Sequence, residues 1–147
     1  MKDDAKVVLL VEDNPHHAEM IFRLLRNCHI AHRIQHVLDG EAALDYLYRQ
    51  GAYADDLLYP MPHLVLLDLR LPKVDGLDVL KQIKSSEDLR SLPVVVLSSS
   101  DADRDIAAAY RQYANSYLVK PIDYEKFTVM IQTLGLYWLT LNRHYLP

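Results

Sequence analysis

Four short apolar runs, separated by stretches with helical periodicity, constrain the fold of this chain more than any other feature. The runs lie at residues 7–11, 64–67, 94–97 and 117–119. No charged residue interrupts them, which is typical of strands buried on both faces of a parallel sheet. A more polar run at residues 32–37 suits an edge strand.

Helical patterns fill the stretches that follow these runs. The first begins at Pro15, a residue suited to the first turn of a helix. An alanine-rich fourth helix is expected over residues 103–113, and a fifth begins near Asp123, a good N-cap residue. The helical stripes of the first three are Met20, Ile21, Leu24 and Leu25; Ala42, Ala43, Tyr46 and Leu47; and Leu77, Leu80 and Ile83 with Lys84 at a polar edge.

The order of elements, a strand followed by a helix five times over, predicts a doubly wound α/β fold. Parallel strands need right-handed crossovers, which place helices on both faces of a five-stranded parallel sheet. Reactive groups of such folds collect beyond the carboxyl ends of the strands. The 147 residues fit one domain, and no repeat or change of composition marks a second.

The composition argues against several classes of function. With 16 basic and 20 acidic residues the formal charge is -4, and no basic run offers a surface for nucleic acid. The single cysteine, Cys28, has no partner for an internal disulfide and is expected to be a small buried residue. No segment has the pattern of a signal peptide or the length to span a bilayer. We therefore expect a soluble cytoplasmic protein without membrane contacts.

Polar and charged side chains follow four of the expected strands directly. They are Glu12 and Asp13, Asp68, Ser98 and Lys120. Each alone could be a helix cap or a solvated turn residue, but five at the same edge of a parallel sheet indicate a site. Three neighbouring carboxylates repel one another unless a cation binds between them. Mg²⁺ suits such a site because it prefers oxygen ligands.

Four motifs resemble those of the receiver domains of two-component response regulators. They are Val-Glu-Asp-Asn-Pro at 11–15, Leu-Leu-Asp-Leu-Arg-Leu-Pro-Lys-Val-Asp-Gly at 66–76, Pro-Val-Val-Val-Leu-Ser-Ser-Ser at 93–100 and Tyr-Leu-Val-Lys-Pro at 117–121. The resemblance covers residues 6–134 with the motifs in order. It implies the flavodoxin-like (βα)5 receiver fold over that core, with residues 135–147 as a C-terminal extension.

The resemblance implies that Asp68 accepts a phosphoryl group from the phosphohistidine of a sensor histidine kinase. Asp13, Asp68 and the backbone carbonyl of Arg70 would bind Mg²⁺, with Glu12 acting through metal-bound water. Lys120 would pair with the phosphoryl oxygens. This agrees with the chemistry, because phosphoryl transfer depends mainly on positioning and charge neutralisation.

The resemblance also implies a conformational switch. Ser98 would move toward the phosphoryl group while Tyr117 changes its burial. The bond before Pro121 would be cis, and Gly76 would supply a turn geometry that other residues resist. Tyr113, shortly before the 117–121 motif, stands where receiver domains often have glycine.

The C-terminal segment is rich in aromatic and apolar side chains, and a helical stripe continues past Gly135 through Trp138 and Leu141. Exposed aromatic residues would indicate an interface, while a tail folded back on its own domain explains them almost as well. The Tyr-Trp-Leu-Thr sequence at 137–140 is similar to that of stand-alone regulators that partner cyanobacterial-type phytochromes. That resemblance implies a phytochrome kinase as partner and a homodimer through the fourth and fifth helices, the fifth strand and the tail.

Other functions compete with this interpretation. A pseudo-receiver that only binds partners would not need the intact acidic, hydroxyl and lysine set. A nucleotide-binding protein would need a glycine-rich phosphate-binding loop after the first strand, and none of the four glycines lies there. A haloacid-dehalogenase-like phosphatase would need a second acid two residues after the nucleophile, where Arg70 stands. We therefore expect a signalling protein that catalyses only its own phosphorylation and dephosphorylation, not an enzyme acting on other substrates.

Two further features have open interpretations. Among the seven histidines, the set His29, His32 and His36 has the wrong spacing for a metal site, while His16 and His17 lie beside the acidic pair and could contact a phosphodonor. The connection at residues 51–63 is either an ordered surface loop or a partner contact.

Overall fold

Five strands alternate with five helices in a computed structural model that describes residues 5–27 and 32–145. The strands are β1 (Lys6–Val11), β2 (His32–Val37), β3 (Leu64–Leu67), β4 (Val94–Ser98) and β5 (Ser116–Val119). The α-helices are α1 (Pro15–Arg26), α2 (Gly40–Leu47), α3 (Gly76–Ser85), α4 (Asp103–Arg111) and α5 (Tyr124–Leu136). Two shorter helices are the 3-10 helix η1 (Gly51–Tyr53) and the π-helix η2 (Tyr137–Leu141). The expectations for Cys28 and His29 concern positions outside the described residues.

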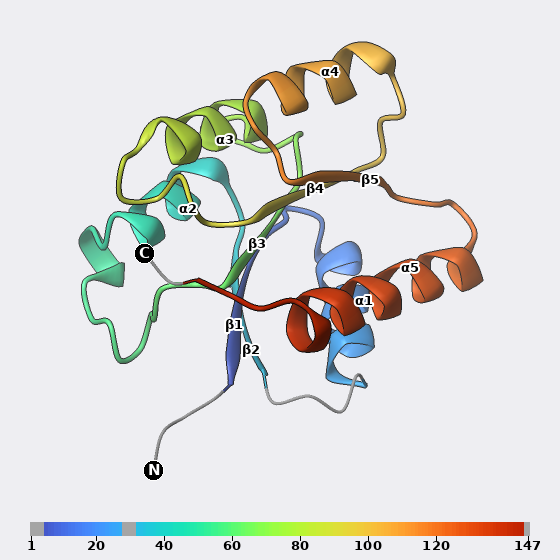
Figure 1. Ribbon diagram of the computed structural model, residues 1–147, viewed down its shortest axis with the longest axis horizontal. Coiled ribbons are helices and arrows are strands. Elements are labelled where there is room, and N and C mark those ends of the chain that lie inside the picture. The colour runs from blue at the N-terminus through green and yellow to red at the C-terminus, as the bar shows by residue number, and fades with distance from the viewer. Residues whose placement is uncertain (1–4, 28–31, 146–147) are drawn as a thin grey trace.

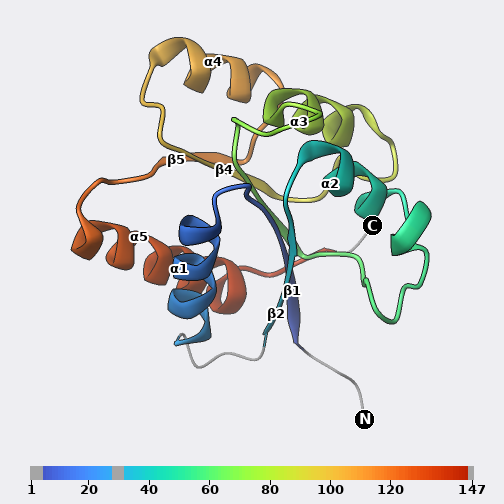
Figure 2. The same ribbon diagram turned by 180° about the vertical axis from the view of Figure 1, so that it is seen from behind.

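The strands form one parallel sheet in the order β2-β1-β3-β4-β5. Helices α1 and α5 cover one face, and α2, α3 and α4 cover the other (Figures 1 and 2). Successive residues of a strand point to opposite faces, so Val8 and Leu10 join the first layer while Leu9 and Val11 join the second. The predicted doubly wound α/β fold is confirmed.

The expectation that four strands are buried on both faces is right for β1, β3 and β4 and wrong for β5. All four residues of β5 retain some exposure, and Val119 is 37% exposed. β5 is the last strand of the sheet, so only one of its edges is paired. β2, at the opposite edge, is the partly exposed edge strand that its polar sequence predicts.

Helix α4 is shorter than predicted, because it ends at Arg111. Tyr113 adopts a φ of 67°, in the left-handed region that glycine occupies without cost. The family's frequent glycine at this position therefore has a conformational reason, and this chain adopts the same backbone with a tyrosine.

The tail continues α5 without a break and then turns back. Gly135 is buried inside the helix, and Trp138 packs against the core between the sheet and helices α1 and α5 instead of pointing into solvent. His144 contacts the Trp138 carbonyl through Nε2 and lies edge-on to His63. Part of the tail therefore folds back on its own domain. Its exposed apolar side chains are Leu136, Tyr137, Leu141 and Tyr145.

The 51–63 connection is an ordered surface loop. Tyr46, Tyr53 and Tyr59 pack with ring centroids 4.9–5.8 Å apart. The Tyr46 hydroxyl donates a hydrogen bond of 2.6 Å to the Pro60 carbonyl. Within the described residues no helix is long and apolar enough to cross a membrane.

Candidate functional site

Three carboxylates meet where β1 and β3 end. The amide of Asp68 donates to the Val11 carbonyl at 3.1 Å, which aligns the end of β3 with the start of the Glu12–Asp13 pair. One ligand oxygen from each of the three acids lies within 4.8 Å of the others. This all-oxygen donor set fits a hard divalent cation such as Mg²⁺.

Glu12 differs from its two acidic neighbours because its side chain is almost fully buried, with 1% exposed. Burial raises the pKa of Glu12 to about 7, and the ammonium of Lys120 opposes that rise. Its Oε2 also accepts the Asn14 amide at 3.2 Å. Burial thus works against the charged form of Glu12, while the Lys120 ammonium and the Asn14 amide favour it.

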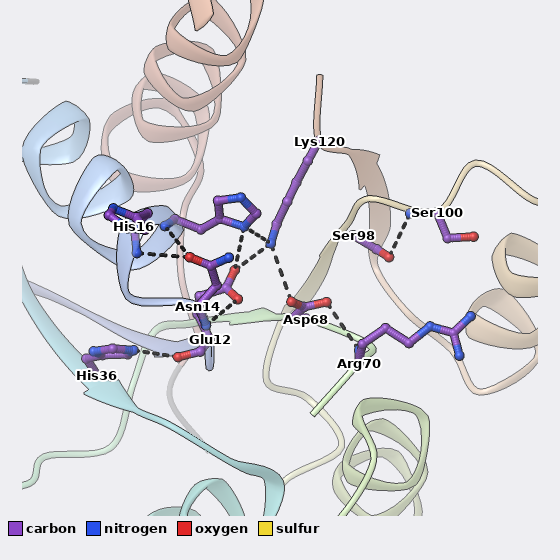
Figure 3. Close-up of polar contacts among 10 residues, drawn as sticks. Glu12, Asn14, His16, His36, Asp68, Arg70, Ser98, Ser100 and Lys120 are labelled. Carbon is purple, nitrogen blue, oxygen red and sulfur yellow. Dashed lines mark hydrogen bonds and ion pairs between the residues drawn. The ribbon is translucent and has the colours of Figure 1, made fainter. Parts of the chain in front are cut away.

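Lys120 joins the carboxylates from the opposite side of the site (Figure 3). Its side chain is only 4% exposed, and Nζ lies 2.5 Å from Glu12 Oε1 and 3.4 Å from Asp68 Oδ2. Its backbone amide donates to the Ser98 carbonyl at 2.7 Å, which fixes the end of β5 beside β4. The bond before Pro121 is trans, so the expected cis bond is wrong. The reach of Lys120 to Asp68 is achieved with the trans bond that X-Pro sequences slightly prefer.

The loop after β3 explains the need for Gly76. Its φ is not in the left-handed region, so the prediction of an unusual turn geometry is wrong. A Cβ at this position would instead lie 2.1 Å from the Asp68 carbonyl oxygen. The Gly76 amide donates to the Leu69 carbonyl at 2.9 Å, which draws the start of α3 against Asp68. Close approach of two backbones is the reason for glycine here.

The predicted switch residues, Ser98 and Tyr117, meet at Ser100. Ser98 is 1% exposed, and its hydroxyl accepts the Ser100 amide at 3.1 Å. The half-buried Tyr117 donates its hydroxyl proton to the Ser100 carbonyl at 2.9 Å. Ser100 was not singled out by the sequence, although it ends the Ser-Ser-Ser run that carries Ser98.

The first turn of α1 brings in a residue whose role the sequence did not resolve. The Asn14 side chain accepts the amides of His16 and His17 at 2.9 and 3.2 Å and caps the helix. This places His17 Nδ1 3.0 Å from Lys120 Nζ. Burial and the charge of Lys120 lower the pKa of His17, so its neutral ring accepts the third ammonium proton. His36 lies behind this group, with its Nε2 2.7 Å from the Glu12 carbonyl oxygen.

A pocket of about 440 Å³ opens above Asp68. The site residues Asp13, His17, Ser98 and Lys120 line it together with Asn14, Arg70, Ser99 and Ser100. The Arg70 amide donates to Asp68 Oδ1 at 3.2 Å, while its guanidinium extends away toward α4 (Figure 3). Cationic and hydroxyl side chains thus share the wall of the pocket with two carboxylates, the exposed Asp13 and the nearly buried Asp68.

Comparison with known proteins identifies one family and several relatives. The profile of the response regulator receiver domain matches residues 8–132. The probable methanogenesis regulatory protein FilR2 of Methanothrix harundinacea is 47% identical over 96% of this chain and 88% of its own length. Response regulator Rcp1 of Synechocystis is 40% identical over 91% of this chain and 89% of its own length.

Solved structures agree with this assignment. The Mn²⁺-bound form of Rcp1 superposes with a TM-score of 0.90 at 38% identity, over 95% of this chain and 99% of that one. The phosphorylated cyanobacterial phytochrome response regulator RcpA gives a TM-score of 0.90 at 36% identity, over 95% and 98% of the two chains. The fold, the domain profile and the sequence relatives all point to one family.

Proposed function

This chain belongs to the response regulator receiver family, and we propose that it acts by accepting a phosphoryl group on Asp68 from a sensor histidine kinase. The observation that carries the proposal is the surroundings of Asp68. Its carboxylate is nearly buried, two other carboxylates lie within 4.8 Å, and the Lys120 ammonium is 3.4 Å away. A structural carboxylate would not need this concentration of charge.

In the proposed transfer, Asp68 is the only residue of this protein that forms a covalent bond to the phosphoryl group. An Asp68 oxygen attacks the phosphorus of the kinase phosphohistidine, an O–P bond forms, and the P–N bond breaks with its electron pair returning to the imidazole. Lys120 is already oriented at Asp68 and would neutralise a phosphoryl oxygen. Hydrolysis would reset the protein: water attacks the phosphorus, the bond between phosphorus and the Asp68 oxygen breaks, inorganic phosphate leaves, and Asp68 is again a carboxylate. The only catalysis that we propose is therefore on the chain itself.

The divalent cation that we propose is Mg²⁺, which would neutralise charge on the transferring phosphoryl group. Asp13, Asp68 and the carbonyl of Arg70 would hold it, and Glu12 would act through bound water. The oxygen-only donor set supports this choice, as does the Mn²⁺-bound form of the similar protein Rcp1.

We propose Ser98 and Tyr117 as the residues that respond to phosphorylation. The Ser98 hydroxyl would leave the Ser100 amide for a phosphoryl oxygen, and Tyr117 would change its contact with the Ser100 carbonyl. Both present hydrogen bonds end on Ser100, which supports a linked movement. The alternative, a pseudo-receiver that binds partners without phosphorylation, lacks a reason for the buried Lys120.

Phosphorylation is tested by incubating the protein with acetyl phosphate or phosphoramidate and Mg²⁺ and measuring intact mass. The wild type should gain one phosphoryl group and Asp68→Asn none. Asp78→Asn, which removes an exposed charge from the next helix, should behave as wild type. Failure of the wild type to gain mass would support the pseudo-receiver, and a full gain in Asp68→Asn would exclude Asp68 as the acceptor.

For partners, we propose a phytochrome-type kinase and a homodimer through α4, β5, α5 and the tail. The likeness to Rcp1 and RcpA supports the photoreceptor, while the similarity to FilR2 keeps other sensor kinases as competitors. We further propose that residues 1–147 act as a single cytoplasmic receiver domain, with residues 135–147 contributing to the dimer.

The dimer proposal is best tested at Tyr137. Both Tyr137 and Trp138 line the apolar groove between β5 and α5. The partly buried Trp138 also packs against the core, so its loss would disturb the fold, whereas Tyr137 is 49% exposed. Tyr137→Lys should shift the sedimentation profile toward monomer, while Leu57→Lys, in the distant loop where Leu57 is 82% exposed, should not. Equal profiles for Tyr137→Lys and wild type would refute this interface.

A further inference from the structure

Asp105, in the first turn of α4, connects Arg70 in the pocket above Asp68 to the proposed switch residues Ser98 and Tyr117. Its Oδ2 accepts the Ser100 hydroxyl at 2.5 Å and lies 3.3 Å from Arg70 Nη2. Ser100 is in turn bound to Ser98 and Tyr117 through its amide and carbonyl. One carboxylate thus links the loop after β3 to the loop after β4 and, through Ser100, to β5.

These contacts matter because α4 buries little of its surface. Ala109 is its only buried residue, whereas α3 buries Gly76, Val79, Leu80 and Ile83. The side chain of Asp105 is 21% exposed, so its bonds to Ser100 and Arg70 are partly shielded from water. A helix with so small a buried face depends on such polar contacts for its position.

The Arg70 guanidinium can pair with either of two anions, the Asp105 carboxylate or a phosphoryl group on Asp68. Arg70 follows Asp68 by two residues, it lines the same pocket, and its side chain is 71% exposed and therefore free to reorient. A phosphoryl group on Asp68 would place several strongly accepting oxygens in that pocket, and a guanidinium binds phosphate oxygens in paired hydrogen bonds. The phosphoryl group carries more charge than the Asp105 carboxylate, so it is the stronger competitor.

We propose that Asp105 is a positioning residue of the switch: it holds Arg70 and Ser100 in the unphosphorylated protein, and Arg70 leaves it for the phosphoryl group when Asp68 is modified. Asp105 then keeps only Ser100, whose amide loses its acceptor at the same time if Ser98 also moves. Helix α4 is released from the loop after β3. This inference rests on the proposed phosphorylation of Asp68 and adds the route by which α4 responds.

The test is a double-mutant cycle read by binding of beryllofluoride, a phosphoryl analogue, in the presence of Mg²⁺. Asp105→Asn retains an acceptor for Ser100 but frees Arg70, so it should tighten binding about threefold, the size of a partly exposed ion pair. Arg70→Gln should weaken binding about fivefold. In the Arg70→Gln background, Asp105→Asn should have no effect, because the competition it removes no longer exists.

Two matched variants separate this competition from other effects of charge. Asp103→Asn removes an exposed carboxylate from the same helical turn and should leave the affinity within experimental error of wild type. Asp105→Glu keeps the carboxylate and should stay closer to wild type than Asp105→Asn. Hydrogen exchange adds a readout of α4: beryllofluoride should speed exchange of the Ile106 amide, which now donates to the Ala102 carbonyl at 3.2 Å.

The outcomes are distinct. Wild type that binds beryllofluoride, with equal effects of Asp105→Asn in the two backgrounds, would overturn the partner exchange and leave the phosphorylation of Asp68 intact. Unchanged exchange in α4 on binding would overturn the release of the helix. Wild type that neither binds beryllofluoride nor gains mass from acetyl phosphate would overturn both proposals.

Discussion

The middle of the sheet and its β5 edge differ in how deeply their residues are buried. We call β1, β3 and α3 the firm side and β5 and α4 the loose side. β1 and β3 are buried on both faces, and the helix after β3 buries three large or branched apolar side chains. On the other side, β5 keeps some exposure at every residue and α4 buries a single alanine. The carboxylates of the site follow the firm strands, whereas Tyr117 and Asp105 belong to the loose elements.

This difference separates the residues of the proposed phosphoryl transfer from those of the proposed response. The relative placement of Asp13 and Asp68 is set by strands that cannot shift without disturbing the core. Ser98 lies at the boundary, since it ends the buried strand β4 and begins the loop that leads to α4. In the proposed mechanism, a charge added at Asp68 can therefore change the loose side at low cost while Asp68 itself stays in place.

The largest expected effect comes from removing the same side chain on each side. Ile83→Ala, in α3 where the residue is fully buried, should lower the free energy of unfolding by about 3–4 kcal/mol through loss of burial and a cavity. Ile106→Ala, in α4 where the residue is only half-buried, should lower it by about 1 kcal/mol. Urea denaturation of both variants measures the two values. Similar losses would contradict the division into a firm and a loose side.

The firm side is also the part of the molecule that the sequence predicts best. Uninterrupted apolar runs such as residues 64–67 specify a strand buried on both faces, and the acids that follow them must share an edge. The apolar residues Tyr117, Leu118 and Val119 predict an equally buried β5, but its place at the edge depends on strand order, which a local pattern does not contain.

The contacts of the site were less accessible to prediction. Asp68, Lys120 and the acidic pair come together because strand ends coincide. His17 and Asp105 reach the site through side chains, and their positions depend on how α1 and α4 sit on the sheet. Nothing in their sequence spacing separates them from solvated polar residues of a first helical turn.

A smaller effect is expected at the end of α4, where Tyr113 has its φ of 67° and is 74% exposed. Tyr113→Gly relieves the left-handed conformation, whereas Tyr113→Ala keeps it, and both lose the same exposed ring. The glycine variant should therefore be more stable than the alanine variant by about 1 kcal/mol in urea denaturation. An alanine variant as stable as the glycine variant would show that this turn reorganises, which would make the loose side looser than the structure indicates.

The smallest expected effect is a pH dependence of stability that arises at the amino-terminal ends of β1 and β3, on the firm side. His63 Nδ1 accepts the Val7 amide of β1 at 3.0 Å, so the ring must be neutral in this contact. Burial lowers the pKa of His63 from 6.5, with help from the neighbouring His144 and Lys6. Between that lowered pKa and 6.5, the unfolded chain binds more protons than the folded one. Stability should therefore fall as the pH drops below 6.5 and be unaffected by this group well above it.

His63→Gln keeps an acceptor for the Val7 amide but cannot titrate, so its stability should decline less than that of wild type as the pH falls from about 8 to about 5.5. His16→Gln, at an exposed position of α1, should follow the wild-type curve. Urea midpoints across this range measure the difference in slope. Parallel curves for His63→Gln and wild type would mean that β1 can give up its contact with His63 freely. In that case only the carboxyl-terminal ends of β1 and β3, around the carboxylates, would be firmly held, because protonation of His63 at their amino-terminal ends would cost no stability.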